Sequence, residues 1–438
     1  MPLLATDLEL TRHSYYTATA GERRAYPALE GDAGCDVAIV GGGLAGLSAA
    51  IDLRERGMNV VVLEAHQVGF GASGRNGGQA IHGLACDQTV IEQQLGLDEA
   101  RRIWGMSIEA LTLLKQRINE HHIACEWQDG YLSLATSPRK GQALMGWAER
   151  METVYGYPQQ RISPSELPGW IASPRFHSGV HDSQSGHLHP LKYTLGLAQA
   201  AASAGVRIHE NTAVQGLDQG PAPVLRTNRG QVRAKQVLLA GNVYLQGVVP
   251  TLARRIMPVG TYIACSEVLD KPLADSLIPS RSAVCDTNFV LDYFRTTTDN
   301  RMLYGGRVSY STVTPPNLAQ AMRQRMNKTF PQLANTKVDY AWGGFVDVSM
   351  NRAPDFGRLP AAQAQGPQNI YYLQGFSGHG LSLTGMAGRL VAQAMTGDAS
   401  RFDVFTRLRH RPFPGGALLR RPALVLGMAW YRLRDMLA

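Results

Sequence analysis

Residues 35–46, with the sequence CDVAIVGGGLAG, decide the fold of this 438-residue chain. Residues 35–40 form a short apolar run that is typical of a buried strand. Residues 44–56 carry apolar side chains at helical spacing, and Gly57 ends that helix. A second apolar run, VVVLE, follows at residues 60–64. The order strand, helix, strand predicts a βαβ opening.

The turn inside this unit has the spacing of a dinucleotide-binding motif. Gly41 suits the tight turn, Gly43 lets the backbone approach a diphosphate, and Gly46 lets helix and strand pack closely. The helix N-terminus then offers N–H groups to phosphates. Glu64 ends the second strand, where it can accept hydrogen bonds from the adenosine ribose hydroxyls. We therefore predict a bound dinucleotide, and the motif alone leaves FAD and NAD both open.

Two further glycine-rich runs favour FAD. Residues 69–79 read GFGASGRNGGQ, and Ser73 and Arg75 within them can contact diphosphate or ribityl oxygens. Residues 375–380 read GFSGHG and precede a predicted helix, whose N-terminus can face the negative charge of a reduced flavin. The sequence has no second strand–GxGxxG–helix unit, which argues against a flavin reductase with a separate NAD(P)H domain.

Composition and charge exclude several other classes. The chain has a net charge of +8, and its one dense basic stretch lies at residues 407–421. No basic–aromatic module predicts nucleic-acid binding, and no apolar run is long enough to predict a membrane span. The five cysteines include no CxxC pair, which favours a reduced, cytoplasmic protein. Peripheral membrane contact through the C-terminus stays open as an alternative.

The coarse pattern predicts an α/β fold with a Rossmann-type FAD-binding domain and a substrate domain built on a mainly antiparallel sheet. Further helices are predicted over residues 98–120, 190–204 and 381–396. Short alternating strands are predicted between residues 251 and 340. The domain ranges expected are 1–90, 176–250 and 341–410 for FAD binding, 91–175 and 251–340 for the substrate domain, and 411–438 for a basic C-terminal extension.

Several motifs together resemble the FAD-dependent amine oxidoreductases of the D-amino-acid-oxidase-like superfamily, in particular the branch that acts on γ-glutamylputrescine. The motifs that carry this resemblance are SYY at 14–16, GASGRNGGQ at 71–79, SGHLHP at 185–190, GFSGHGLSLTG at 375–385 and PFPGG at 412–416. They extend over almost the whole chain.

The resemblance implies a set of FAD contacts by position. These are Gly41, Gly43, Leu44, Ala45, Gly46, Glu64, Ala65, Ala72, Ser73, Arg75, Asn76, Gly77, Gly78, Gln79, Val214, Gly241, Gly375, Gly378, His379, Gly380 and Leu381. Some relatives bind flavin covalently through a histidine, which aligns with Asn76 here, or through a cysteine, which residues 347–353 lack. Non-covalent FAD is therefore expected.

The resemblance also suggests residues for catalysis and for substrate binding. The expected catalytic residues are His379, Tyr262, Tyr293 and His187, and the expected substrate-binding residues are Arg295, Trp342 and Ser382. We expect Arg295 to pair with a distal substrate carboxylate. Ser382 stands where some amino-acid-oxidising relatives have a lysine that holds the substrate carboxylate.

Four histidines at 177, 181, 187 and 189 lie close together in the sequence. This segment reads as a glycine-rich loop, and a zinc site needs three or four ligands on a rigid frame. We therefore predict no metal site.

The implied reaction is oxidation of an amine, such as γ-glutamylputrescine or a related polyamine derivative. A hydride passes to flavin N5, the imine is hydrolysed to aldehyde and ammonia, and oxygen or another acceptor takes the electrons. One alternative is an oxidase or dehydrogenase of the same fold for D-amino, N-methyl-amino or cyclic amino acids. Another is a membrane-surface flavoprotein that feeds a quinone or a partner protein.

Overall fold

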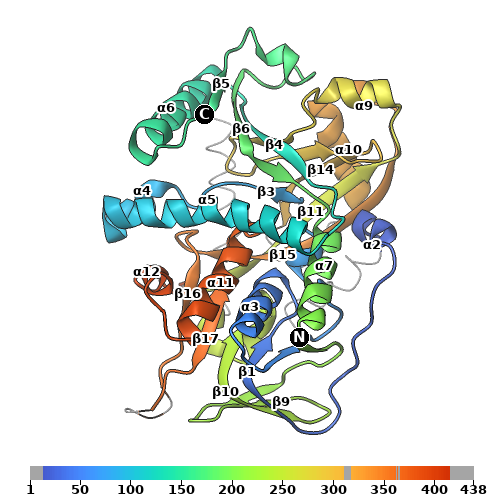
Figure 1. Ribbon diagram of the computed structural model, residues 1–438. Helices are drawn as coiled ribbons and strands as arrows, with labels where there is room; N and C mark the ends of the chain where they lie inside the picture. Colours follow the sequence, from blue (N-terminus) through green and yellow to red (C-terminus); the bar gives the residue numbers. More distant parts are fainter. Residues whose placement is uncertain (1–12, 310–316, 362, 364–365, 415–438) are drawn as a thin grey trace.

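The computed structural model describes residues 13–309, 317–361, 363 and 366–414. These residues form two β-sheets with helices around them (Figure 1). The long helix α5, Leu97–Glu120, lies across the middle of the molecule. The first sheet is on one side of it and the strands β4, β6 and β14 are on the other. The mixed α/β class predicted from the sequence is confirmed.

The first sheet contains the predicted βαβ opening. Its main strand order is β16–β17–β10–β1–β2–β7, and β8 and β9 form a hairpin on β10. The strands are β1 Ala33–Val40, β2 Val60–Leu63, β7 Arg207–His209, β8 Gly216–Asp218, β9 Val224–Arg226, β10 Gln231–Leu239, β16 Asp355–Arg358 and β17 Ile370–Gln374. β1 runs parallel to both β2 and β10, as a Rossmann-type sheet requires.

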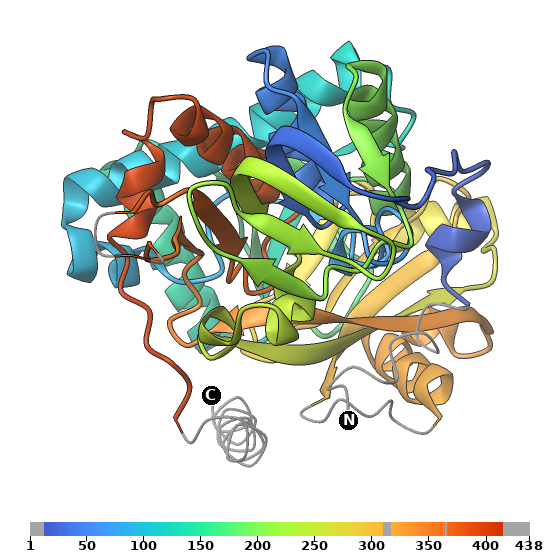
Figure 2. The ribbon, with the colours of Figure 1, turned by 90° about the horizontal axis from the view of Figure 1, so that it is seen from below.

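Helices α3 (Leu44–Glu55) and α11 (Leu383–Met395) pack on the first sheet and on each other. Val37, Ile39, Val60 and Val62 are fully buried in the apolar core that these helices share with β1 and β2. Burial of each such side chain contributes about 1.5–3 kcal/mol. Seen from below in Figure 2, the long orange strand β15 lies on the opposite side of this sheet from the red helix α11.

The second sheet has the order β15–β11–β14–β13–β12–β4–β6–β3, with β5 paired to β6. Its strands are β3 Gln79–Ala80, β4 Gln128–Ala135, β5 Gln160–Ile162, β6 Ser178–His187, β11 Ile256–Ser266, β12 Ala283–Asp286, β13 Tyr293–Thr296, β14 Met302–Ser309 and β15 Val338–Ser349. Its pairs are antiparallel except for β12 with β4. The mainly antiparallel sheet predicted for the substrate domain is therefore present.

The prediction of a loop at the histidine-rich segment is wrong. Residues 178–187 form strand β6, which pairs with β4 and β3. A Cβ on Gly179 would lie 2.6 Å from a Leu134 side-chain carbon, and one on Gly186 would lie 2.4 Å from the carbonyl oxygen of Gln128. These glycines therefore mark close approach of neighbouring strands, a role that glycine also has inside sheets. β6 belongs to the second sheet although it lies in the range 176–250 that we assigned to the FAD domain. The exact domain boundaries stay a prediction.

The remaining helices frame the two sheets. They are α2 Tyr15–Thr19, α4 Gln88–Leu95, α6 Pro138–Tyr155, α7 Pro190–Ser203, α8 Pro250–Ala253, α9 Lys271–Leu277, α10 Leu318–Thr329 and α12 Phe402–Thr406, with short 3-10 turns η1 Ala72–Gly74, η2 Leu167–Gly169, η3 Asn242–Gly247 and η4 Pro331–Leu333. No helix in the described part of the chain is long and apolar enough to cross a membrane. Of the predicted C-terminal extension, residues 415–438 lie outside the described residues.

Candidate active site

A cavity of about 790 Å³ is lined by residues of both sheets. This volume is within the usual range for ligand and cofactor sites, about 300–1,000 Å³. The carboxyl ends of β1 and β2 open onto it, as do the N-termini of α3 and α11. The three glycine-rich runs, which are far apart in the sequence, therefore meet at one place.

The N-terminus of α3 is shaped to receive an anion. Gly43 gives this helix no side-chain cap, so the first turn presents backbone N–H groups. Ser73 approaches from the second glycine run and accepts a hydrogen bond from Leu44 N at 3.0 Å. A Cβ on Gly43 would lie 2.7 Å from the Ser73 hydroxyl. Any larger residue at position 43 would therefore close the space in front of the helix.

Glu64 ends β2 and is held by the neighbouring backbone. Its carboxylate accepts hydrogen bonds from Gly42 N at 2.7 Å and from His66 N at 3.0 Å. Burial raises the pKa of Glu64, and these two N–H groups act in the opposite direction. The orientation suits a carboxylate that receives ribose hydroxyls at the edge of the cavity.

The second glycine run forms a rigid turn at η1. The Asn76 amide donates to the carbonyls of Ala72 and Ser73 and accepts from Gly78 N at 2.8 Å. Arg75 is 5% exposed and donates to the Tyr244 hydroxyl at 2.8 Å. It also donates to the carbonyls of Gly71, just before η1, and of Gly343 on β15, so it joins the nucleotide-binding turn to the second sheet.

The third glycine run is held by a buried carboxyl group that the sequence reasoning did not identify. Asp347 on β15 accepts hydrogen bonds from the backbone N–H groups of Gly375 and Phe376. It is 2% exposed, and burial raises its pKa to about 6. Asp347 thus holds the backbone of this turn against strand β15.

His379 lies in the same turn and lines the cavity. Its Nε2 is 2.7 Å from the carbonyl oxygen of His82, which can only accept, so Nε2 carries the proton. Burial lowers the pKa of His379 to about 4, so the ring is neutral at pH 7 and Nδ1 is an acceptor. Ser382 lies one turn further and donates to Ile81 O at 3.1 Å. The segment 81–82 thus orients both side chains.

Most of the predicted site residues lie on the cavity wall. Those that line it are Gly41, Gly43, Leu44, Ala45, Glu64, Ala65, Ala72, Ser73, Arg75, Asn76, Gly77, Gln79, Val214, Gly241, Tyr293, Gly378, His379, Gly380, Leu381 and Ser382. Gly46, Gly78, Gly375, Tyr262, His187, Arg295 and Trp342 do not line it.

Arg295 and His187 are corrections to the sequence-based assignment. Arg295 is 3% exposed and donates to the carbonyls of Gly77 and Leu188 and to the Tyr16 hydroxyl. His187 lies between Arg295 and the carbonyl oxygen of Arg281, and burial lowers its pKa to about 3. Both side chains are buried next to residues of the cavity wall and do not line the cavity.

Five other predicted site residues do not line the cavity: Tyr262, Trp342, Gly46, Gly78 and Gly375. Trp342 is fully buried and donates through Nε1 to Arg75 O at 3.0 Å. Tyr262 is 1% exposed in the core of the second sheet. A Cβ on Gly46 would lie 2.1 Å from Gly41 O, so Gly46 serves helix–strand packing. Gly78 and Gly375, with φ of +75° and +78°, hold turns that other residues rarely adopt.

Several cavity residues have no signal in the sequence. Asp286, Phe289 and Arg352 line the cavity from loops and strand ends. Arg352 lies in the run 347–353, from which the sequence analysis used only the lack of a cysteine that could bind flavin covalently. In the described part of the chain, no group of three or more His, Cys, Asp or Glu side chains could hold a metal ion.

The chain belongs to a family of flavoenzymes. Residues 36–394 match the family described as FAD dependent oxidoreductase, DAO. The chain is 43% identical to gamma-glutamylputrescine oxidoreductase of Escherichia coli (strain K12), over 98% of this chain and 100% of that protein. It is 37% identical to the probable oxidoreductase OrdL of Haemophilus influenzae, over 96% and 97% of the two chains. The fold is that of glycine oxidase from Geobacillus kaustophilus, with a TM-score of 0.71 at 19% identity, over 86% of this chain and 100% of that one.

The predicted cofactor, FAD, is thereby confirmed, and the protein is an FAD-dependent amine oxidoreductase. The residues on the cavity wall fit this cofactor. The N-terminus of α3, whose N-cap residue Gly43 has no side chain, suits a diphosphate. Glu64 suits a ribose, and the turn at Gly378–Gly380 borders the same space.

Proposed function

We propose that this protein oxidises the primary amine of γ-glutamylputrescine or of a closely related polyamine derivative. The observation that carries the proposal is the 43% identity to the Escherichia coli gamma-glutamylputrescine oxidoreductase, over 98% of this chain and 100% of that protein. The position after the last glycine run supports it. Ser382 lies on the cavity wall there and donates a hydrogen bond to Ile81 O. Because a serine has no positive charge, this position offers no cation to a carboxylate next to the reacting carbon.

FAD, when bound, accepts a hydride from the amine carbon, and the resulting imine is hydrolysed to an aldehyde and ammonia. The chain supplies binding and orientation. The α3 N-terminus and Ser73 would hold the diphosphate, and Glu64 would hold the adenosine ribose. We further propose that FAD is bound non-covalently, because the side chain of Asn76 forms its hydrogen bonds within the turn around it.

In this proposal His379 and Tyr293 face the substrate. A neutral His379 with a free lone pair on Nδ1 suits an amine that must lose its proton before it can give up a hydride. The amine has a solution pKa of about 10, like lysine, so the site must favour its deprotonated form. Burial raises the pKa of Tyr293, which keeps its hydroxyl protonated as a donor. The electron acceptor is oxygen or another oxidant, and the cytoplasmic location remains a prediction.

Anaerobic mixing tests the proposal. The holoenzyme is mixed with γ-glutamylputrescine, with putrescine and with a panel of D-, N-methyl and cyclic amino acids, and the flavin absorbance is followed. Bleaching by γ-glutamylputrescine supports the proposal, and admission of air then shows whether oxygen reoxidises the enzyme. Bleaching by amino acids alone contradicts the substrate assignment and leaves the family intact.

A further inference from the structure

The loop between β12 and β13, residues 287–292, forms one wall of the cavity. Phe289 and Leu291 from this loop line the cavity, as does Asp286 at its start. Phe289 is 37% exposed, so this wall lies where the cavity meets solvent. Across from the loop, the guanidinium carbon of Arg352 lies 5.6 Å from the centre of the Phe289 ring. The wall thus combines an aromatic face with a cation.

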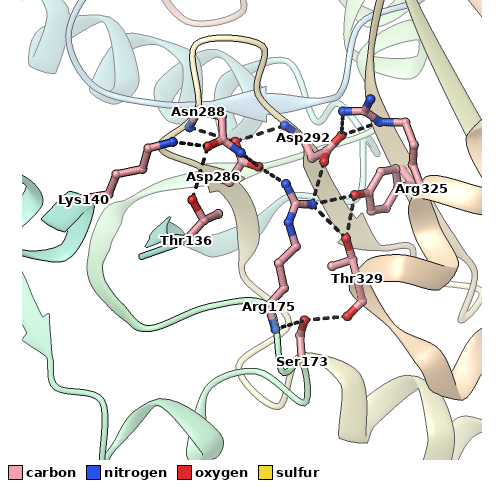
Figure 3. A network of polar contacts seen from close by, with 10 residues as sticks. Thr136, Lys140, Ser173, Arg175, Asp286, Asn288, Asp292, Arg325 and Thr329 are labelled. Atoms are coloured by element: carbon pink, nitrogen blue, oxygen red, sulfur yellow. Dashed lines mark hydrogen bonds and ion pairs between the residues drawn. The ribbon is translucent and has the colours of Figure 1, made fainter. Parts of the chain in front are cut away.

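The loop is held by a network of charges around two buried carboxyl groups (Figure 3). Arg175 donates to Asp286 and to Asp292, at 2.6 Å each. Arg325 from α10 donates to the other oxygen of Asp292. Both carboxyl groups lie at the ends of the loop, and both residues are less than 5% exposed. The network therefore fixes the loop, and with it the position of Phe289.

Asp286 does not offer a site for a cationic group, although it lines the cavity. Its Oδ1 accepts from the backbone N–H groups of Asn288 and Asp292, and its Oδ2 accepts from Arg175 and from the Asn288 amide. A carboxylate has about four acceptor positions, and all four are used here. Burial raises its pKa to about 6, which leaves it ionised beside Arg175 at neutral pH.

Three other charged side chains on the wall form hydrogen bonds within the protein. Glu64 accepts backbone N–H groups, Arg75 donates to Tyr244 and to carbonyls, and Asp347 holds the third glycine run. Arg352 adds a positive charge beside Phe289. Burial is the main cause of the lowered pKa of His379, and the charge of Arg352 acts in the same direction.

The backbone of Arg352 is in an uncommon conformation. Its φ is +60°, in the left-handed region that residues with a side chain rarely occupy. A hydrogen bond from Arg352 N to Ser349 O at 3.1 Å closes this turn. Such conformations persist where the surroundings impose them, and they are frequent at ligand sites. Here the conformation accompanies a guanidinium group on the cavity wall.

We propose that Arg352, stacked on Phe289, binds the carboxylate at the far end of the amine substrate and thereby determines specificity. The inference rests on the proposed function, because the γ-glutamyl group carries such a carboxylate. It assigns to Arg352 the role that sequence reasoning gave to Arg295. A guanidinium group recognises a carboxylate through two parallel N–H···O bonds.

The test compares two substrates on the holoenzyme. One is γ-glutamylputrescine and the other is the same molecule with its α-carboxylate converted to a carboxamide. We expect the wild-type kcat/KM to be about 10-fold or more higher for the carboxylate, the lower end for a charged hydrogen bond at a partly exposed site. In Arg352→Gln this ratio should fall close to 1, and in Arg352→Lys it should be intermediate. Arg139→Gln, on the exposed face of α6, is the matched control and should keep the wild-type ratio.

A binding measurement separates specificity from turnover. N-butylglutamine, which is γ-glutamylputrescine without its reacting amine, is titrated into wild type and Arg352→Gln by calorimetry, and we expect its affinity to fall about 10-fold in the variant. Equal ratios and equal affinities in the two proteins would overturn the inference even where γ-glutamylputrescine reduces the flavin. If neither substrate reduces wild-type flavin, the proposed function itself fails. N-butylglutamine binding that depends on Arg352 would then still support a carboxylate site.

Discussion

Replacing Asp347 by asparagine is expected to remove a pH-dependent loss of stability. Asp347 is almost completely buried, and burial raises its pKa from 3.8 to about 6. The folded protein therefore binds this proton more tightly than the unfolded chain does. Its contribution to stability is greatest below pH 4, declines as the pH rises through about 6, and is constant above that. Asparagine cannot ionise, so the variant lacks this term.

The magnitude follows from the two pKa values. Between pH 4 and pH 7, an aspartate with a pKa of about 6 in the fold and 3.8 in the unfolded chain lowers the free energy of unfolding by about 2 kcal/mol. The pKa of about 6 already includes the hydrogen bonds from Gly375 N and Phe376 N, which lower the pKa of Asp347 against the larger effect of burial. Relative to wild type, Asp347→Asn should gain about 2 kcal/mol over this pH interval, which corresponds to about 2 °C in Tm for a chain of this size.

The assay is thermal unfolding of the FAD-saturated wild type and variant at pH 4, 5, 6 and 7. The difference in Tm between the two proteins at each pH cancels the other titrating groups. Asp218→Asn, at an exposed ion pair, is the control and should show no such trend. A Tm difference that is constant across the four pH values, or that changes in favour of wild type at high pH, would refute the reasoning about burial.

Three further changes test the site. Gly46→Ala should abolish FAD retention, measured as flavin absorbance relative to protein absorbance, because its Cβ would lie 2.1 Å from Gly41 O. Gly105→Ala, whose Cβ would meet no atom within 4 Å, should retain FAD. Glu64→Gln should weaken FAD binding about 10-fold in a titration of apoprotein, since a charged acceptor becomes neutral; unchanged affinity would remove Glu64 from the ribose site. Arg295→Met should lower stability by about 2–4 kcal/mol in denaturant unfolding, because a buried donor to two carbonyls is lost; a variant with normal stability but a raised KM would restore Arg295 as a substrate residue.

The nucleotide-binding half of the site could be predicted from the sequence because its requirements are local. A strand, three glycines at fixed spacing and a helix lie within 22 residues, from 35 to 56, and each glycine answers a steric need inside that unit. Gly46 shows this directly, since its close neighbour is Gly41 in the same turn. The second and third glycine runs were recognisable by composition, but Gly77, Gly78 and Gly375 approach Tyr293, Leu188 and Asp355, which are distant along the chain.

The substrate half could not be predicted in the same way, because it depends on what covers each side chain. Arg295 is separated from the cavity by contacts with Tyr16, 279 residues away, and with Leu188. Arg352 reaches the cavity because a left-handed turn after β15 directs it toward a loop that Arg175 holds in place. The sequence by itself determined the cofactor, the family and the opening of the first sheet. Only the tertiary structure decided that Arg295 is buried and that Arg352 lies on the cavity wall, since the burial of a charge is set by residues that are distant along the chain.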